Sequence, residues 1–139
     1  MREVQPAFFD TNIFVYADDS SNPVRRQKAV ALIEEYVQSK SLIISLQIIQ
    51  EYYAAATRKL QVDPELAQAK VELMAQMRVV RLQERDIISA IELHRLHKLP
   101  FWDAMVVHAA RLGGARVLFS EDLDHGRSWG GLTVISPFR

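Results

Sequence analysis

The chain has 139 residues, of which 49% are apolar and 24% are charged, values typical of a soluble globular protein and not of a disordered or fibrous one. The 17 lysines and arginines balance the 17 aspartates and glutamates, so the overall charge does not indicate a strongly basic nucleic-acid-binding protein. The absence of cysteine excludes disulfides and thiolate metal sites. We expect one domain spanning residues 1–139, because this length suffices for a single core.

No segment of the sequence is predicted to direct the chain to a membrane. Residues 1–6 lack the apolar core of about 7–15 residues that a signal peptide needs. No later stretch approaches the roughly 18 apolar residues of a membrane span. With the absence of cysteine, these features predict a cytoplasmic protein without membrane contact.

The first half of the chain alternates predicted strands and helices. Residues 7–9 are apolar without alternation, which is typical of a parallel strand buried on both faces. The pair Asn22-Pro23 predicts a helix start. Residues 42–44 predict a second strand, after which Ser45 is expected to cap a helix that carries Glu51 about two turns from its start.

The second half continues this alternation. Its predicted elements are a helix over residues 64–77, a strand over 79–82, a helix over 86–96, a helix beginning near Asp103 and ending at Gly113-Gly114, a strand over 117–119, a loop over 124–131 and an edge strand over 132–135. The helix after Asp103 is apolar around most of its circumference and is expected to pack centrally. Alternating strands and helices predict an α/β fold, a three-layer α/β/α sandwich with a mostly parallel sheet of about five strands.

Four acidic residues lie at related places in this predicted fold. Asp10 and Asp122 follow strands, and loops at the carboxyl ends of strands form the ligand-binding crevice of open α/β sheets. Asp103 falls in the first turn of a helix, where the macrodipole favours negative charge. With Glu51, these residues are expected to converge at one edge of the sheet. Alternatively, Asp10 only caps a helix and Glu51 is a solvated helix residue.

Converging carboxylates predict a metal site. Several negative charges in one place repel one another, and a divalent cation removes that conflict. Oxygen ligands without histidine or cysteine favour Mg²⁺ or Mn²⁺ over Zn²⁺. Such an ion can lower the pKa of a bound water and orient a phosphodiester for in-line displacement.

The acids stand in four short motifs, Phe9-Asp10-Thr11-Asn12, Gln50-Glu51-Tyr52, Phe101-Trp102-Asp103-Ala104 and Phe119-Ser120-Glu121-Asp122-Leu123. In order and spacing these motifs resemble the PIN-domain nucleases, and among them the VapC-type toxins of bacterial toxin-antitoxin pairs. The resemblance implies Mg²⁺-dependent cleavage of structured cellular RNA, with Mn²⁺ as a possible substitute. It also implies a homodimer and inhibition by a cognate antitoxin whose tail enters the active-site groove.

The resemblance also assigns roles to residues. Asp10, Glu51, Asp103 and Asp122 match the catalytic and metal-binding acids of the family, whereas Thr11, Asn12 and Ser120 match polar positions that place water or metal-bound groups. The motif around Ser120 departs from the family, because many members have threonine there and a basic or small residue next. Whether Glu121 or Asp124 also binds metal, and whether one or two ions bind, stays open.

Two other functions are compatible with the sequence. In a phosphoaspartate phosphatase Asp10 would be the nucleophile, but the Asp-x-Asp pattern of such enzymes is broken by Asn12. A catalytically inactive PIN-like module would bind a protein partner instead, although such modules usually lose acids that this chain retains.

The histidines, several aromatic residues and the basic groups are expected to have structural roles. Of the histidines, His94 and His97 are expected at the surface, His108 in the core and His125 in a loop. Phe14, Tyr16, Tyr52 and Tyr53 are expected in the core or a dimer interface. The basic groups Arg25-Arg26-Lys28, Arg58-Lys59 and Arg78-Arg81-Arg85 are candidate phosphate contacts, each more simply a solvated helix face.

Overall fold

The computed structural model describes residues 4–139, so part of the amino-terminal stretch expected to lack a signal peptide lies outside the described residues. Over this range the strands are β1 (Ala7–Phe9), β2 (Leu42–Ser45), β3 (Arg78–Val80), β4 (Val117–Phe119), β5 (Ser128–Trp129) and β6 (Leu132–Ile135). The helices are α1 (Thr11–Ala17), α2 (Pro23–Gln38), α3 (Leu46–Arg58), α4 (Pro64–Met74), α5 (Glu84–His97) and α6 (Phe101–Leu112).

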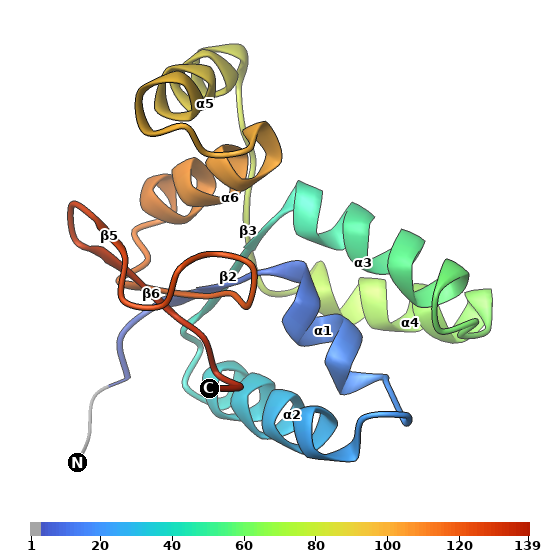
Figure 1. The fold of residues 1–139 in the computed structure, drawn as a ribbon. Coiled ribbons are helices and arrows are strands. Elements are labelled where there is room, and N and C mark those ends of the chain that lie inside the picture. The colour runs from blue at the N-terminus through green and yellow to red at the C-terminus, as the bar shows by residue number, and fades with distance from the viewer. Residues whose placement is uncertain (1–3) are drawn as a thin grey trace.

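The described strands form one six-stranded sheet in the order β3-β2-β1-β4-β6-β5 (Figure 1). Neighbouring strands run parallel except β5, which pairs with β6 in the antiparallel sense. At the centre of the sheet, Phe8 of β1 is in register with Ile43 of β2 and Leu118 of β4. The carboxyl ends of β1 and β4 therefore lie side by side, and the residues that follow them share one edge.

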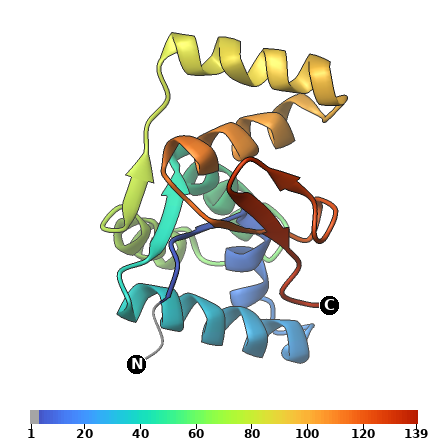
Figure 2. The same ribbon diagram turned by 90° about the vertical axis from the view of Figure 1, so that its left-hand side faces the viewer.

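Helices cover both faces of the sheet. In both views α5 and α6 lie on one side and α2 lies on the other, as the three-layer prediction requires (Figure 1 and Figure 2). The ring of Phe9 packs against Tyr36 of α2 and Phe119 of β4, with centroids 5.4 and 5.2 Å away. The predicted α/β sandwich with a mostly parallel sheet is thus confirmed.

Helix α6 is the central packed helix that its apolar sequence predicted. Its buried residues are Ala104, Met105, Val106, Val107, Ala109 and Ala110. Small side chains on this helix allow a close approach to the sheet, and a methyl group added at Gly113 would lie 2.7 Å from a methyl of Val80. The helix therefore holds its amino-terminal turn, with Asp103, in a fixed position.

The remaining differences from prediction are local. The segment 124–131, predicted as loop, contains strand β5, so the sheet has six strands and β6 is not at its edge. The apolar pattern placed β3 one or two residues late, ended α4 at 77 instead of Met74 and began α5 at 86 instead of Glu84. Ser45 occupies the N-cap position of α3, but its buried hydroxyl accepts no capping hydrogen bond from the helix backbone and has no partner among the described residues.

No helix within residues 4–139 is both long enough and apolar enough to cross a membrane.

Candidate active site

Asp10 directly follows β1, and its side chain is 7% exposed. Its Oδ1 accepts a 2.8 Å hydrogen bond from the backbone N–H of Thr11, and its Oδ2 accepts one of 2.8 Å from the Ser120 hydroxyl. The pKa of Asp10 is raised to about 6, chiefly by burial and also by the charges of Asp122 and Glu51, against the lowering effect of these hydrogen bonds. Asp10 does cap α1, as the simpler interpretation held, but it also faces other acids.

Glu51 lies on α3, and its side chain is held by a residue at the start of α1, the helix that follows β1. The Thr11 hydroxyl donates a 2.7 Å hydrogen bond to Oε1 of Glu51. Gln47, one turn earlier on α3, donates a longer bond of 3.4 Å to Oε2. Although exposed, Glu51 is therefore held against the start of α1 and is not a freely solvated helix residue.

Asp122 lies three residues beyond the end of β4. Its Oδ2 accepts a 3.0 Å hydrogen bond from the Asn12 amide, and its backbone N–H donates one of 3.3 Å to the Ser120 hydroxyl. Ser120 thus contacts both Asp10 and the backbone of Asp122. Each of the three predicted polar residues holds a different carboxylate: Ser120 holds Asp10, Thr11 holds Glu51 and Asn12 holds Asp122.

Asp103 lies in the first turn of α6 and forms no hydrogen bond with another described residue. Burial raises its pKa, and the charges of Asp122 and Glu51 raise it further. Asp103 is therefore the carboxylate whose charge the protein compensates least.

One cavity of about 230 Å³ brings the four acids together. The residues that line it are Asp10, Thr11, Asn12, Val15, Gln47, Glu51, Ala55, Lys59, Trp102, Asp103, Val106 and Asp122. Of the predicted polar residues, Ser120 is absent from this lining because it is fully buried behind Asp10. The sheet edge thus presents a small cavity with four carboxylates and one lysine.

Gln47, Lys59 and Trp102 also line this cavity, but sequence reasoning did not place them there. The sequence does indicate the first two, because Gln47, Glu51, Ala55 and Lys59 are spaced four residues apart and therefore share one face of a helix. Trp102 directly precedes Asp103 in the same helical turn.

The two acids left open by the sequence lie elsewhere. Glu121 forms an ion pair with Arg25 of α2, and neither Glu121 nor Asp124 lines the cavity. Arg25 also lies over the rings of Tyr16 and Phe138, at 5.1 and 5.3 Å from their centroids. Within this structure Glu121 is a partner of α2 and not a member of the carboxylate group.

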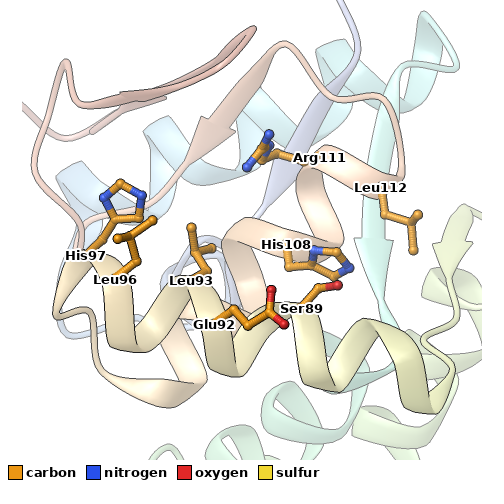
Figure 3. Close-up of a pocket in the computed structure, with 8 residues that line it drawn as sticks. All are labelled: Ser89, Glu92, Leu93, Leu96, His97, His108, Arg111 and Leu112. Atoms are coloured by element: carbon orange, nitrogen blue, oxygen red, sulfur yellow. The ribbon is translucent and has the colours of Figure 1, made fainter.

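A larger cavity of about 540 Å³ lies between α5 and α6. Figure 3 shows its lining side chains, Ser89, Glu92, Leu93, Leu96 and His97 from α5 and His108, Arg111 and Leu112 at α6. Its lining holds one carboxylate, Glu92, and one of its two histidines, His108, forms a 3.0 Å hydrogen bond with Asp86. This cavity therefore lacks the converging acids of the smaller one.

His94, His108 and Tyr52 form hydrogen bonds within the fold and do not line the acidic cavity. His108 has a hydrogen-bond partner, as predicted, but it is half-buried and not fully in the core. His94 is also half-buried, with its Nδ1 against the carbonyl of Leu99, instead of fully at the surface. Tyr52 is 1% exposed, and its hydroxyl donates a 2.5 Å hydrogen bond to Asp18.

The donor chemistry of the small cavity fits a hard divalent cation. All its ionised oxygens are carboxylates, and the pKa values of Asp10 and Asp103 are raised by burial first and by neighbouring negative charge second. Within residues 4–139 no three His, Asp or Glu side chains form a ready-made ligand cluster. Mg²⁺ is nevertheless suited to such a place, because it usually takes one or two carboxylates and completes its shell with water and substrate phosphate.

Solved structures with a similar fold include two from toxin-antitoxin systems. VapC20 of Mycobacterium tuberculosis, a toxin that cleaves the sarcin-ricin loop, aligns with a TM-score of 0.65 and 20% identity over 84% of this chain and 91% of that one. A toxin-antitoxin complex from Klebsiella pneumoniae aligns with a TM-score of 0.68 and 22% identity over 94% of this chain and 97% of that one. At these identities the similarity establishes the fold.

Comparison with curated protein sequences gives no match. The family model of the PIN domain, in contrast, matches residues 7–127. This match covers most of the chain and includes all four converging acids, so the chain belongs to the PIN domain family.

Proposed function

We propose that this protein is a Mg²⁺-dependent endoribonuclease that hydrolyses RNA phosphodiester bonds, with Mn²⁺ able to replace Mg²⁺. The observation that carries this proposal is the convergence of Asp10, Glu51, Asp103 and Asp122 on one cavity at the carboxyl ends of β1 and β4. Membership in the PIN domain family supports a nuclease.

The four carboxylates would hold the cation. Asp10 is the most deeply buried of them, and the charge of Asp103 is the least compensated by the protein. When bound, the ion supplies an activated water and neutralises the phosphate charge that builds up during displacement. The protein's own polar side chains supply orientation. Ser120 donates to Asp10 and thereby favours its ionised form, while Thr11 and Asn12 fix one oxygen each of Glu51 and Asp122.

We also propose that the protein is the toxin of a toxin-antitoxin pair and is inhibited by a cognate antitoxin. Its similarity in fold to VapC20 and to a chain of the Klebsiella pneumoniae toxin-antitoxin complex supports this role. A homodimer is part of the same proposal. The exposed isoleucines Ile87, Ile88 and Ile91 on α5 support a protein contact on that helix.

The proposal is tested by incubating total cellular RNA with the protein and mapping new RNA ends. We expect discrete cuts with Mg²⁺ or Mn²⁺ and none with EDTA. Equal patterns with metal and with EDTA would contradict metal dependence. No cuts in any metal would favour the inactive PIN-like binding module, and capture of a partner protein would then be the next measurement.

A further inference from the structure

Trp102 is an exposed aromatic residue at the edge of the acidic cavity. It is 61% exposed, and of the large exposed apolar side chains within residues 4–139 it is the one that lines this cavity. Its ring packs edge-on against Phe101, with centroids 5.0 Å apart and planes at 69°. The indole is therefore supported from one side while most of its surface faces solvent beside Asp103.

Lys59 lies at the carboxyl end of α3, the helix that also contributes Gln47, Glu51 and Ala55 to the cavity lining. It is the C-cap residue of α3 and is exposed, and it is the single basic residue among those described as lining the cavity. Two helical turns separate it from Glu51, a rise of about 12 Å. The base of its side chain is therefore offset along α3 from the carboxylate of Glu51, in a position suited to contact a neighbouring part of a bound polymer.

We propose that Trp102 and Lys59 form a subsite for single-stranded RNA, in which the indole stacks on a nucleobase and the ammonium group pairs with a backbone phosphate next to the scissile one. This inference rests on the proposed function and extends it to the substrate. Every base presents a π-face, so stacking on one aromatic ring tolerates any sequence. The four carboxylates repel a polyanion, and a lysine and an aromatic ring at the rim offset that repulsion without adding charge among the acids.

A nucleic-acid ligand explains both residues together. A contact with a second copy of the chain would account for an exposed tryptophan but not for a lysine at the rim of an acidic cavity. The pairing of an aromatic ring with a cation is the usual composition of a single-strand binding groove. The two side chains come from different helices, α6 and α3, and line the same cavity as the four carboxylates, so one bound strand could contact both of them and the acids.

The chain allows a direct optical test, because its other tryptophan, Trp129, is 5% exposed and lies in β5. Asp10→Asn protein with Mg²⁺ is titrated with a short unstructured RNA oligonucleotide while tryptophan fluorescence and binding are measured. We expect quenching that disappears in Trp102→Leu, whose affinity falls about 5- to 150-fold. Trp102→Phe should retain most of the affinity. Lys59→Gln should weaken binding and lower the slope of log affinity against log salt by about one.

Matched controls separate the subsite from general surface effects. Leu96→Ala removes an exposed apolar side chain, and Arg95→Gln removes an exposed basic one on α5, and neither residue lines the acidic cavity. Both controls should bind RNA as the parent protein does. If Trp102→Leu binds RNA as tightly as the parent, the subsite is disproved. If it instead sediments as a smaller species with unchanged affinity, Trp102 is a subunit contact and the inference is likewise overturned.

Cleavage assays distinguish failure of this inference from failure of the proposed function. If wild-type protein cleaves RNA and Trp102→Leu has the same KM and kcat, the subsite is wrong while the nuclease assignment stands. If wild-type protein cleaves no RNA in any metal but Trp102 fluorescence is quenched by the oligonucleotide, the subsite stands and the nuclease assignment is wrong. We expect Trp102→Leu to raise KM with little change in kcat, since stacking away from the reacting bond contributes to ground-state binding.

Discussion

The Ser120 hydroxyl donates a 2.8 Å hydrogen bond to Oδ2 of Asp10, a residue 110 positions earlier in the chain. Because β1 and β4 are parallel neighbours, the residues after their carboxyl ends meet, and Ser120 lies behind Asp10 with no exposed surface. Two opposing effects therefore act on this carboxyl: burial raises its pKa and the bond from Ser120 lowers it, and burial dominates, so that the resulting pKa is about 6.

The raised pKa of Asp10 predicts that the metal-free protein loses stability as the pH rises from about 4 to 6. The folded state binds the proton more tightly than the unfolded state, whose pKa is near 3.8, so ionised Asp10 destabilises the fold above pH 6 and the penalty vanishes below pH 4. The penalty is of order 2–3 kcal/mol. Urea unfolding in EDTA should show Asp10→Asn gaining stability over wild type between pH 4 and pH 7. A difference that does not change with pH would contradict the assigned pKa.

Ser120→Ala should shift the acid limb of the cleavage rate upward in pH. Losing the donor removes an effect that lowers the pKa of Asp10, so a larger fraction of the carboxyl is protonated at any pH near 6. Activity at pH 7 should fall by about 10- to 100-fold, the usual cost of removing a group that orients a metal ligand. The measurement is the full pH profile, with Ser120→Thr as the control that keeps the hydroxyl. A uniform loss at all pH values, without a shift, would indicate a merely structural role.

Mg²⁺ should stabilise the folded protein. On the proposed function the cation would relieve the repulsion among the four carboxylates, and a ligand that binds only the folded state adds about 1.4 kcal/mol for each tenfold excess over its Kd. Thermal unfolding should therefore occur at a higher temperature with Mg²⁺ than with EDTA. Asp103→Asn should lose most of this increase. Asp103 has no hydrogen-bond partner among the described residues, so the cation would be the main group that compensates its charge. An equal increase in wild type and Asp103→Asn would place the ion elsewhere.

Gly113→Ala should destabilise the fold without changing the chemistry of the site. The added methyl would lie 2.7 Å from a side-chain carbon of Val80 and 3.1 Å from one of Ile43, closer than packed atoms approach. Overpacking of this kind costs about 1–3 kcal/mol. Gly131→Ala is the control, since its methyl would meet only the end of the Arg116 side chain, which can move. Urea unfolding of both variants measures the difference, and equal stabilities would contradict close packing at Gly113.

The elements that the sequence predicted well are those with a strong local signal. Residues 7–9, 42–44 and 117–119 are short apolar runs, and each forms a buried strand. The apolar circumference of α6 likewise predicted its central position. Strand β5 was missed because it has two residues in a glycine-rich segment, and its existence depends on pairing with β6.

The four acids could be selected from the sequence, but their connections could not. The bonds from Thr11 to Glu51 and from Asn12 to Asp122 join residues 40 and 110 positions apart, so they exist only once the sheet has formed. Similarly, local patterning could not show that Glu121 pairs with Arg25, 96 positions away. Gln47, Glu51 and Lys59 share a helix face by spacing, yet which face meets the cavity depends on how α3 packs.

The most direct test of the central claim is the initial rate of RNA cleavage in Mg²⁺ for Asp10→Asn, Glu51→Gln, Asp103→Asn and Asp122→Asn, with Asp124→Asn as the matched control. Asp124 is an exposed acid near Asp122 that does not line the cavity. We expect Asp10→Asn and Asp103→Asn to abolish cleavage, Glu51→Gln and Asp122→Asn to reduce it strongly, and Asp124→Asn to cleave at the wild-type rate, with all five proteins folded. Wild-type rates in Asp10→Asn or Asp103→Asn would contradict the assignment of the carboxylate cavity as the active site.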